Sequence, residues 1–229
     1  MAASARSFHR SLLQLVLVTD GRGDPARLER IVDQVVAAGV RTVQLREPEL
    51  PARVLLRTCE RLLPILQRVG GLLLVNDRVD VAAAGAAHGA QIGHRSLPPE
   101  LARKVLGLDP VLGLSAHDRA ELDLATAGGC DFALLSPVWP TPSKPGAPHL
   151  GAVRAAQLTA AARLPVVWLG GVTVGVLGGL AALPQVAWPA GFAVRSAIMG
   201  ADDPGVAAAE LLAATAALLG AAAPQPTRP

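Results

Sequence analysis

Short apolar runs alternate with longer amphipathic segments along the whole chain, and each apolar run ends in polar or glycine residues. Eight such units can be counted. The runs are rich in Val and Leu, which is typical of strands buried on both faces of a parallel sheet. The strands are expected at Leu15–Thr19, Thr42–Leu45, Leu72–Val75, Gly89–Ile92, Val111–Ser115, Phe132–Leu135, Val166–Leu169 and Gly191–Val194.

The segments between these runs have helical spacing, and several begin with proline or with an aspartate that can cap a first turn. Helices are expected at Pro25–Ala38, Pro51–Val69, Val79–Ala86, Pro98–Leu106, Asp118–Ala127, Val153–Ala162, Thr173–Leu183 and Pro204–Leu219. Strict alternation predicts parallel strands joined by right-handed crossovers. Eight units of this size predict an α/β fold, a (β/α)8 TIM barrel in a single domain.

A doubly wound open sheet is the alternative architecture. It usually carries a glycine-rich dinucleotide turn after its first strand, and residues 19–23 lack the full pattern. The barrel is therefore preferred. We expect it to span residues 12–219, with flexible termini at 1–11 and 220–229.

The chain has 229 residues, is 51% hydrophobic and carries a net charge of +3, which is typical of a globular protein. The 21 Lys and Arg residues are scattered and form no basic run, so we expect no nucleic-acid partner. No charged residue occurs from Leu164 to Val194, but prolines and glycines divide that stretch into short runs. We therefore expect buried strands there and no membrane partner.

The chain start has only a faint resemblance to a signal peptide, because the apolar run is short and no small-residue cleavage site follows it. Cys59 and Cys130 stand alone, without CxxC or Cys/His spacing. Isolated cysteines of this kind indicate buried, reduced thiols and no zinc site. These features together predict a cytoplasmic protein. No interface pattern stands out, so the sequence leaves both a monomer and a homo-oligomer open.

Polar residues follow nearly every predicted strand, and a barrel brings the carboxyl ends of its strands to one mouth. Double glycine at 170–171 and the segment Arg195-Ser196-Ala197 offer backbone N–H groups, which predicts a phosphate site there. Residues 140–146 combine two hydroxyls and a lysine with stiffening prolines, as in a loop that closes over an anion. The candidates at the rim are Gln44, Arg46, Asn76, Asp77, His94, Arg95, Ser115, His117, Ser136 to Lys144, Gly170, Gly171, Arg195 and Ser196.

Together these residues resemble the superfamily of thiamine phosphate synthases and TenI-type thiazole tautomerases, which are (β/α)8 barrels. The resemblance covers nearly the whole chain and rests most on Asn76-Asp77-Arg78 and Pro140-Thr141-Pro142-Ser143-Lys144. It also rests on Val43-Gln44-Leu45-Arg46-Glu47, Gly113-Leu114-Ser115-Ala116-His117 and Leu169-Gly170-Gly171-Val172-Thr173.

The resemblance implies a role for each candidate. A synthase joins a pyrimidine methyl pyrophosphate to a thiazole phosphate, with Mg²⁺ and cationic residues stabilising the departing pyrophosphate. By resemblance, the pyrophosphate ligands are Arg46, Asn76 and Lys144, the Mg²⁺ ligand is Asp77, the pyrimidine neighbours are Gln44 and Ser115, and the thiazole phosphate ligands are Thr141, Ser143, Gly171 and Ser196.

Two departures from the synthase pattern argue against that reaction. Pro48 stands where the pattern has a lysine, and Ser96 stands where it has a second Mg²⁺-binding aspartate. Arg95, beside Ser96, cannot replace a metal ligand, because a guanidinium about 4 Å from a divalent ion is repelled by roughly 8 kcal/mol at an effective dielectric of 20. It can bind phosphate directly.

The tautomerase branch needs neither pyrophosphate departure nor a metal, because it only moves a proton on a thiazole carboxylate phosphate. His117 matches the acid/base histidine of that branch, and histidine exchanges protons near neutral pH. We therefore expect a thiamine-biosynthesis enzyme that acts on a small phosphorylated heterocycle, with tautomerase chemistry and no cofactor preferred. The alternatives are a synthase that uses Mg²⁺ and a barrel that binds thiazole or thiamine phosphate without turnover.

Overall fold

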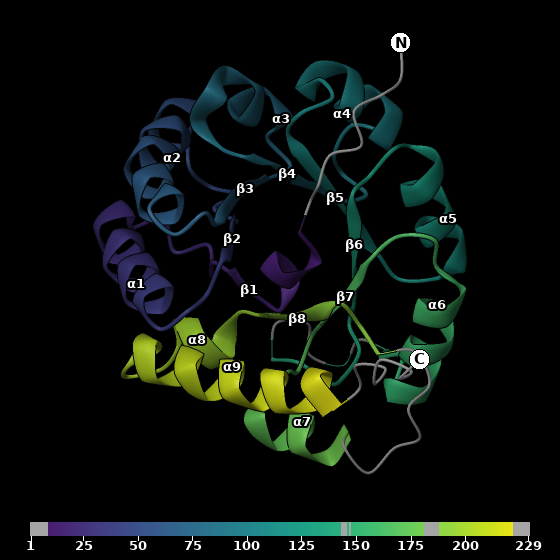
Figure 1. The fold of residues 1–229 in the computed structure, drawn as a ribbon. Helices are drawn as coiled ribbons and strands as arrows, with labels where there is room; N and C mark the ends of the chain where they lie inside the picture. Colours follow the sequence, from purple (N-terminus) through teal and green to yellow (C-terminus); the bar gives the residue numbers. More distant parts are fainter. Residues whose placement is uncertain (1–8, 143–145, 147, 181–187, 222–229) are drawn as a thin grey trace, which may run out of the picture.

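The computed structural model describes residues 9–142, 146, 148–180 and 188–221. Eight parallel strands pair in chain order, and β1 pairs with β8 to close the barrel (Figure 1). The strands are β1 (Leu15–Val18), β2 (Thr42–Leu45), β3 (Leu72–Asn76), β4 (Gly89–Ile92), β5 (Val111–Ala116), β6 (Phe132–Leu135), β7 (Val166–Leu169) and β8 (Gly191–Val194). The predicted (β/α)8 barrel is confirmed.

Alternation along each strand divides the core into two parts. Val16 and Val18 of β1 pack inside the barrel with Phe132 and Leu134 of β6. Leu17, one residue over, packs between the sheet and the surrounding helices. This period of two fixes which residue beyond each strand end faces the barrel axis.

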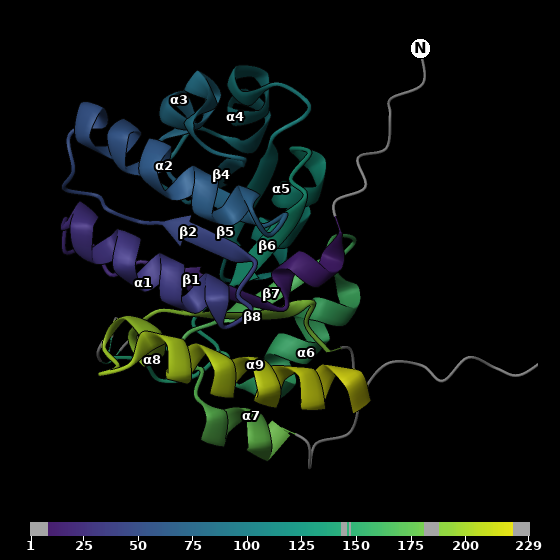
Figure 2. The same cartoon turned by 60° about the vertical axis from the view of Figure 1, so that its left-hand side comes forward.

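A ring of helices covers the outside of the barrel (Figure 2). They are α1 (Pro25–Ala37), α2 (Ala52–Gln67), α3 (Val79–Val81), α4 (Pro99–Leu106), α5 (Arg119–Ala127), α6 (Ala152–Ala161), α7 (Val174–Leu180), α8 (Ser196–Met199) and α9 (Pro204–Ala221). Helix α1 shows why they form where they do: Asp24 accepts a hydrogen bond from Arg27 N at 3.1 Å and Pro25 occupies the first turn.

A short 3-10 helix, η1 (Arg10–Leu13), lies in the middle of the strand ring in Figure 1, where it is coloured purple. Leu13 is fully buried and packs with the residues inside the barrel. Gly191 of β8 lies against the carbonyl of Leu13 so closely that a Cβ there would come within 1.8 Å of it. Helix η1 therefore plugs the end of the barrel opposite the carboxyl ends of the strands.

The structure differs from the expected elements in three places. Helix α8 was not predicted, because four residues are too few to show periodicity. The third helix is broken into α3 and a distorted turn, η2 (Ala82–Ala86), where Gly85 has φ +82°. At the two termini, residues 10–11 belong to η1 and residues 220–221 belong to α9, although both pairs were expected to be flexible. Residues 1–8 and 222–229 lie outside the described part.

The charge-free stretch contains β7, α7 and β8, as predicted, with residues 181–187 outside the described part. Among the helices of the described residues, none has both the length and the apolar character that a bilayer crossing requires. Both cysteines are free thiols, and burial raises the pKa of each to about 12. A thiol with so high a pKa is a poor nucleophile and metal ligand.

Candidate active site

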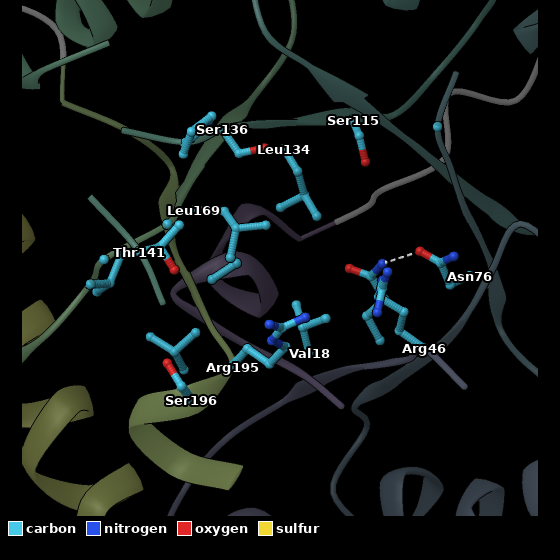
Figure 3. Close-up of a pocket in the computed structure, with 18 of the residues that line it drawn as sticks. Val18, Arg46, Asn76, Ser115, Leu134, Ser136, Thr141, Leu169, Arg195 and Ser196 are labelled. Atoms are coloured by element: carbon cyan, nitrogen blue, oxygen red, sulfur yellow. Dashed lines mark hydrogen bonds between the residues drawn. The ribbon is translucent and has the colours of Figure 1, made fainter. Parts of the chain in front are cut away.

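A cavity of about 380 Å³ opens at the carboxyl ends of the strands (Figure 3). Every described residue with an expected role in binding or catalysis lines it, whereas residues 138–140 and 142 of the rim candidates do not. The lining residues with an expected role are Gln44, Arg46, Asn76, Asp77, Arg95, Ser115, His117, Thr141, Gly171 and Ser196. Ser143 and Lys144 lie outside the described residues. Residues far apart in the sequence thus meet in one place, as expected for a barrel mouth.

The pleat explains why these side chains converge. Thr42 and Gln44 alternate with the outward-packed Val43 and Leu45, so the next inward position on β2 is Arg46. The same period continues β5 through Ser115 to His117. The polar side chains of the cavity therefore occupy the first inward-facing positions beyond the packed layers of the barrel.

A chain of hydrogen bonds connects the ends of β2, β3 and β4. Gln44 Nε2 donates to Asn76 Oδ1 at 2.7 Å, a bond drawn as the dashed line in Figure 3. Asn76 Nδ2 donates to Asp77 Oδ2 at 2.8 Å, and Ser96 Oγ donates to Asp77 Oδ1. The carboxylate of Asp77 is thus held from both sides and oriented by its neighbours.

Asp77 also has an unusual backbone conformation, with φ +60°. Aspartate tolerates this left-handed region better than most residues, and such conformations gather at functional sites. Ser96, read from the sequence only as a lost carboxylate, accepts a hydrogen bond from Gly93 N at 3.1 Å while it donates to Asp77. Its hydroxyl therefore positions the carboxylate that remains.

The side-chain oxygen of Gln44 is buried and has no hydrogen-bond partner among the described residues. Gln44 is only 4% exposed and lines the cavity. A buried acceptor without a partner costs about 1–3 kcal/mol. A ligand with an N–H or amino group at this end of the cavity would remove that cost.

Mg²⁺ is the cofactor that the resemblance implies, and Asp77 is its expected ligand. Within the described residues no three His, Cys, Asp or Glu side chains come together as a metal cage. Mg²⁺ is often held by one or two carboxylates together with substrate phosphates. Each Asp77 oxygen accepts a single side-chain hydrogen bond here, so lone pairs remain. The residues therefore fit an ion shared between Asp77 and a phosphorylated substrate.

The cavity is strongly cationic. Among the described residues that line it are three arginines, Arg46, Arg95 and Arg195, and one carboxylate, that of Asp77. In the described part of the chain Arg95 makes no ion pair with Asp77, and it is exposed at the rim. A net charge of two positive in a concave site attracts polyanions.

The opposite side of the cavity has the features of a phosphate site. Figure 3 shows Thr141 and Ser196 on the side away from Arg46 and Asn76. Ser196 begins helix α8, whose first N–H groups have no partner inside the helix. Gly171 lines the same region with φ +70°.

We expect Gly171→Ala to raise the KM for the phosphorylated substrate on this side by about ten-fold or more. A Cβ at Gly171 would come within 2.4 Å of Pro140 O and 2.8 Å of Trp139 Cβ, so the 139–141 segment must move. Steady-state kinetics checks this, with Gly175→Ala on α7 as a control because a Cβ there meets nothing within 4 Å. Equal KM values in the two variants would contradict a site built on Gly171.

His117 has the geometry of a proton-transfer group. Its Nδ1 donates to Glu121 Oε2 at 2.9 Å, and its backbone N donates to the same oxygen at 2.6 Å. Because the carboxylate holds the proton on Nδ1, the neutral ring presents Nε2 as a base. Its side chain is 39% exposed, so the ring has access to the cavity and to water.

Sequence reasoning assigned no role to the side chains of Glu47 and Arg195. Glu47 is 4% exposed and accepts hydrogen bonds from Thr19 Oγ1 at 2.6 Å, Gly21 N at 3.2 Å and Gly23 N at 2.7 Å. It therefore ties the loop after β1 to the end of β2. The one sequence feature that indicates a role for Glu47 is that it is a carboxylate on an outward position directly after a strand.

Comparison with known proteins gives a consistent family. The family model described as thiamine monophosphate synthase (TMP-TENI) matches residues 15–198. A putative thiamine-phosphate synthase of Geobacter sulfurreducens is 40% identical over 204 residues, which cover 87% of this chain and 92% of the relative. The thiamine-phosphate synthase of Mycobacterium tuberculosis is 37% identical over 217 residues, covering 89% and 95%.

Solved structures agree with the sequence relatives. Thiamine phosphate pyrophosphorylase from Pyrococcus furiosus superposes with a TM-score of 0.80 at 28% identity, covering 92% of this chain and 99% of that one. The matched region contains all eight strands and every described site residue. The chain therefore belongs to the thiamine monophosphate synthase (TMP-TENI) family.

Proposed function

We propose that this protein is a thiamine-phosphate synthase, which joins a pyrimidine methyl pyrophosphate to a thiazole phosphate and releases pyrophosphate. The cationic cavity with a single oriented carboxylate carries the proposal, because a departing pyrophosphate needs both cations and a metal-binding oxygen. The similar proteins named synthase support it. The synthase, which was the alternative in the sequence analysis, therefore has better support than the tautomerase, which was preferred there.

In this reaction the thiazole nitrogen forms a bond to the pyrimidine methylene carbon. The bond from that carbon to the pyrophosphate oxygen breaks, and its electron pair leaves with the pyrophosphate. Mg²⁺, when bound, neutralises charge on the leaving group. Arg46 and Asn76 would contact that group, Asp77 would hold the ion, and Gln44 and Ser115 would face the pyrimidine.

The thiazole phosphate would occupy the region of Thr141, Gly171 and Ser196, with Ser143 proposed as a further ligand. Lys144 is proposed as a further ligand of the pyrophosphate. The two anionic groups would then lie at opposite ends of the cavity, a proposal that the separate positions of Thr141 and Ser196 on one side and Arg46 and Asn76 on the other support. Such an arrangement holds the nitrogen and the methylene carbon near each other, which lowers the entropic cost of their reaction.

Purified protein tests the proposal directly. With both substrates and Mg²⁺ we expect thiamine phosphate and pyrophosphate in equal amounts, and loss of both when Mg²⁺ is chelated. No product in either condition would remove the synthase proposal. Proton exchange on the thiazole carboxylate phosphate would then indicate a tautomerase, and ligand binding without exchange would indicate a non-catalytic barrel.

The tautomerase remains the second candidate because of the His117–Glu121 pair. Proton transfer by a positioned side chain contributes about 10²–10⁴-fold to a rate. The synthase step described above moves no proton, so we expect His117→Asn to lower synthase turnover by less than about ten-fold. If the wild type catalyses proton exchange on the thiazole carboxylate phosphate and His117→Asn lowers the rate of that exchange by about 10²–10⁴-fold, the tautomerase is favoured instead.

A further inference from the structure

Arg195 is a cation in the cavity to which neither the sequence motifs nor the family pattern assigned a side-chain role. It follows β8 directly, and the inward positions Gly191 and Ala193 make residue 195 the next one to face the barrel axis. Figure 3 shows its guanidinium beside Val18, between Ser196 on one side and Arg46 on the other.

Arg195 and Arg46 approach the cavity from opposite sides of one strand. Strand β1 pairs with both β2 and β8, so the ends of β2 and β8 are about 10 Å apart at ordinary strand spacing. Arginine side chains reaching inward from these ends converge above Val18, the last residue of β1. Because both side chains enter the cavity over the same strand, their two charges lie close to each other.

Neither charge is neutralised by an ion pair in the described part of the chain. Asp20 is the carboxylate that acts on Arg195, but it is already bound by Arg27 at 3.0 Å and by Arg22 at 3.2 Å. Burial first, and then the charge of Arg46, lowers the pKa of Arg195. Two like charges held together in a partly buried site favour an anion that binds both.

We propose that Arg195 and Arg46 together clamp the pyrophosphate group of the substrate, and that Arg195 supplies the cation lost at Pro48. The inference rests on the proposed synthase function for the identity of the anion. A pyrophosphate carries oxygens on two phosphorus atoms, so each guanidinium can form its own paired hydrogen bonds. A single phosphate spans a shorter distance, so it would reach two guanidinium groups that enter from different strands less well than a pyrophosphate does.

Calorimetric titration with inorganic pyrophosphate at fixed Mg²⁺ tests the clamp without requiring turnover. We expect Arg195→Met to weaken pyrophosphate binding by about 10–100-fold, the range of a hydrogen bond to a charged group. Orthophosphate binding is expected to change by less than about three-fold. Arg195→Lys keeps the charge but loses the forked guanidinium, so we expect its pyrophosphate affinity to lie between that of the wild type and that of Arg195→Met.

The matched control is Arg22→Ala. Arg22 lies near the same mouth, is 68% exposed and does not line the cavity, so its removal leaves the three arginines of the cavity in place. Because Arg22 binds Asp20, this variant also measures how much that carboxylate offsets the charge of Arg195. Circular dichroism and the melting temperature would show that each variant folds. If Arg195→Met is unfolded, the comparison of Arg195→Lys with wild type decides the result.

A rescue experiment tests the second half of the inference. Pro48 is exposed and its ring lies beside Gly21, next to Arg46. Adding Pro48→Lys to Arg195→Met should restore at least about ten-fold of the lost pyrophosphate affinity. In the synthase assay the single Arg195 variant should raise KM for the pyrimidine pyrophosphate and change KM for the thiazole phosphate by less than about two-fold.

The outcomes separate the clamp from the reaction. Wild-type pyrophosphate affinity in a folded Arg195→Met variant would overturn the clamp even if the protein makes thiamine phosphate. A raised KM confined to the thiazole phosphate would overturn it too. Arg195-dependent pyrophosphate binding in a protein that makes no thiamine phosphate would support the clamp and reject the synthase function.

Discussion

Asp77→Asn is expected to lower the rate of thiamine phosphate formation by about 10³-fold and to abolish its response to Mg²⁺. Asp77 is the one carboxylate among the described residues that line the cavity, so its charge has no substitute there. Loss of a positioned electrostatic group typically costs about 10²–10³-fold in turnover. The measurement is turnover against Mg²⁺ concentration at saturating substrates.

Asparagine is the informative replacement because it retains the shape of the side chain and tolerates the φ of +60° at this position. The melting temperature should therefore change little. Asp80→Asn is the matched control, since Asp80 lies just beyond in the same motif but pairs with Arg78 at the surface, which lowers the pKa of its carboxyl. An Asp77→Asn enzyme that still responds to Mg²⁺ would show that the metal is held elsewhere.

Glu47→Ala is expected to destabilise the protein by about 3 kcal/mol and to raise KM for the pyrimidine pyrophosphate. Three donors from the loop after β1 lose their acceptor, and an unsatisfied buried donor costs about 1–3 kcal/mol, reduced where water can enter. For a chain of this size that corresponds to a fall of about 6–12 °C in the melting temperature.

The kinetic effect has its own cause. Arg46 N donates to Thr19 Oγ1 at 2.8 Å, and the same hydroxyl donates to Glu47, so the loop and the Arg46 backbone are held together. Glu49→Ala is the control, because Glu49 is exposed two residues away and should leave both quantities within error. If Glu47→Ala melts as the wild type does, the hydrogen-bond network around Glu47 contributes nothing to stability.

The preference for a tautomerase rested on comparing the site with the synthase pattern one position at a time. Pro48 and Ser96 are genuine departures, and each removes a charge that the synthase pattern has. The sequence pattern does not show which other residues lie close enough in space to offset these two lost charges. Ser96 hydrogen-bonds to Asp77 instead of replacing a carboxylate, and Arg195 faces Arg46 from a strand at the other end of the chain.

The sequence by itself determined the barrel and its mouth. Short apolar runs and capped amphipathic segments are local signals, and they placed all eight strands within one residue of the observed ends. Polar residues follow the apolar runs, so Gln44, Arg46, Asn76, Ser115 and His117 were expected at the rim, and all five line the cavity.

Only the tertiary structure decided which of these side chains meet. Closing the barrel brings β8 against β1 and so carries Arg195 to Arg46. The pairing of β1 with β2 buries Glu47 under the loop after β1. It also places η1 as a plug, although residues 10–11 were expected to be flexible. Contacts between distant residues depend on closure, shear and loop path, and no periodicity along the chain records these.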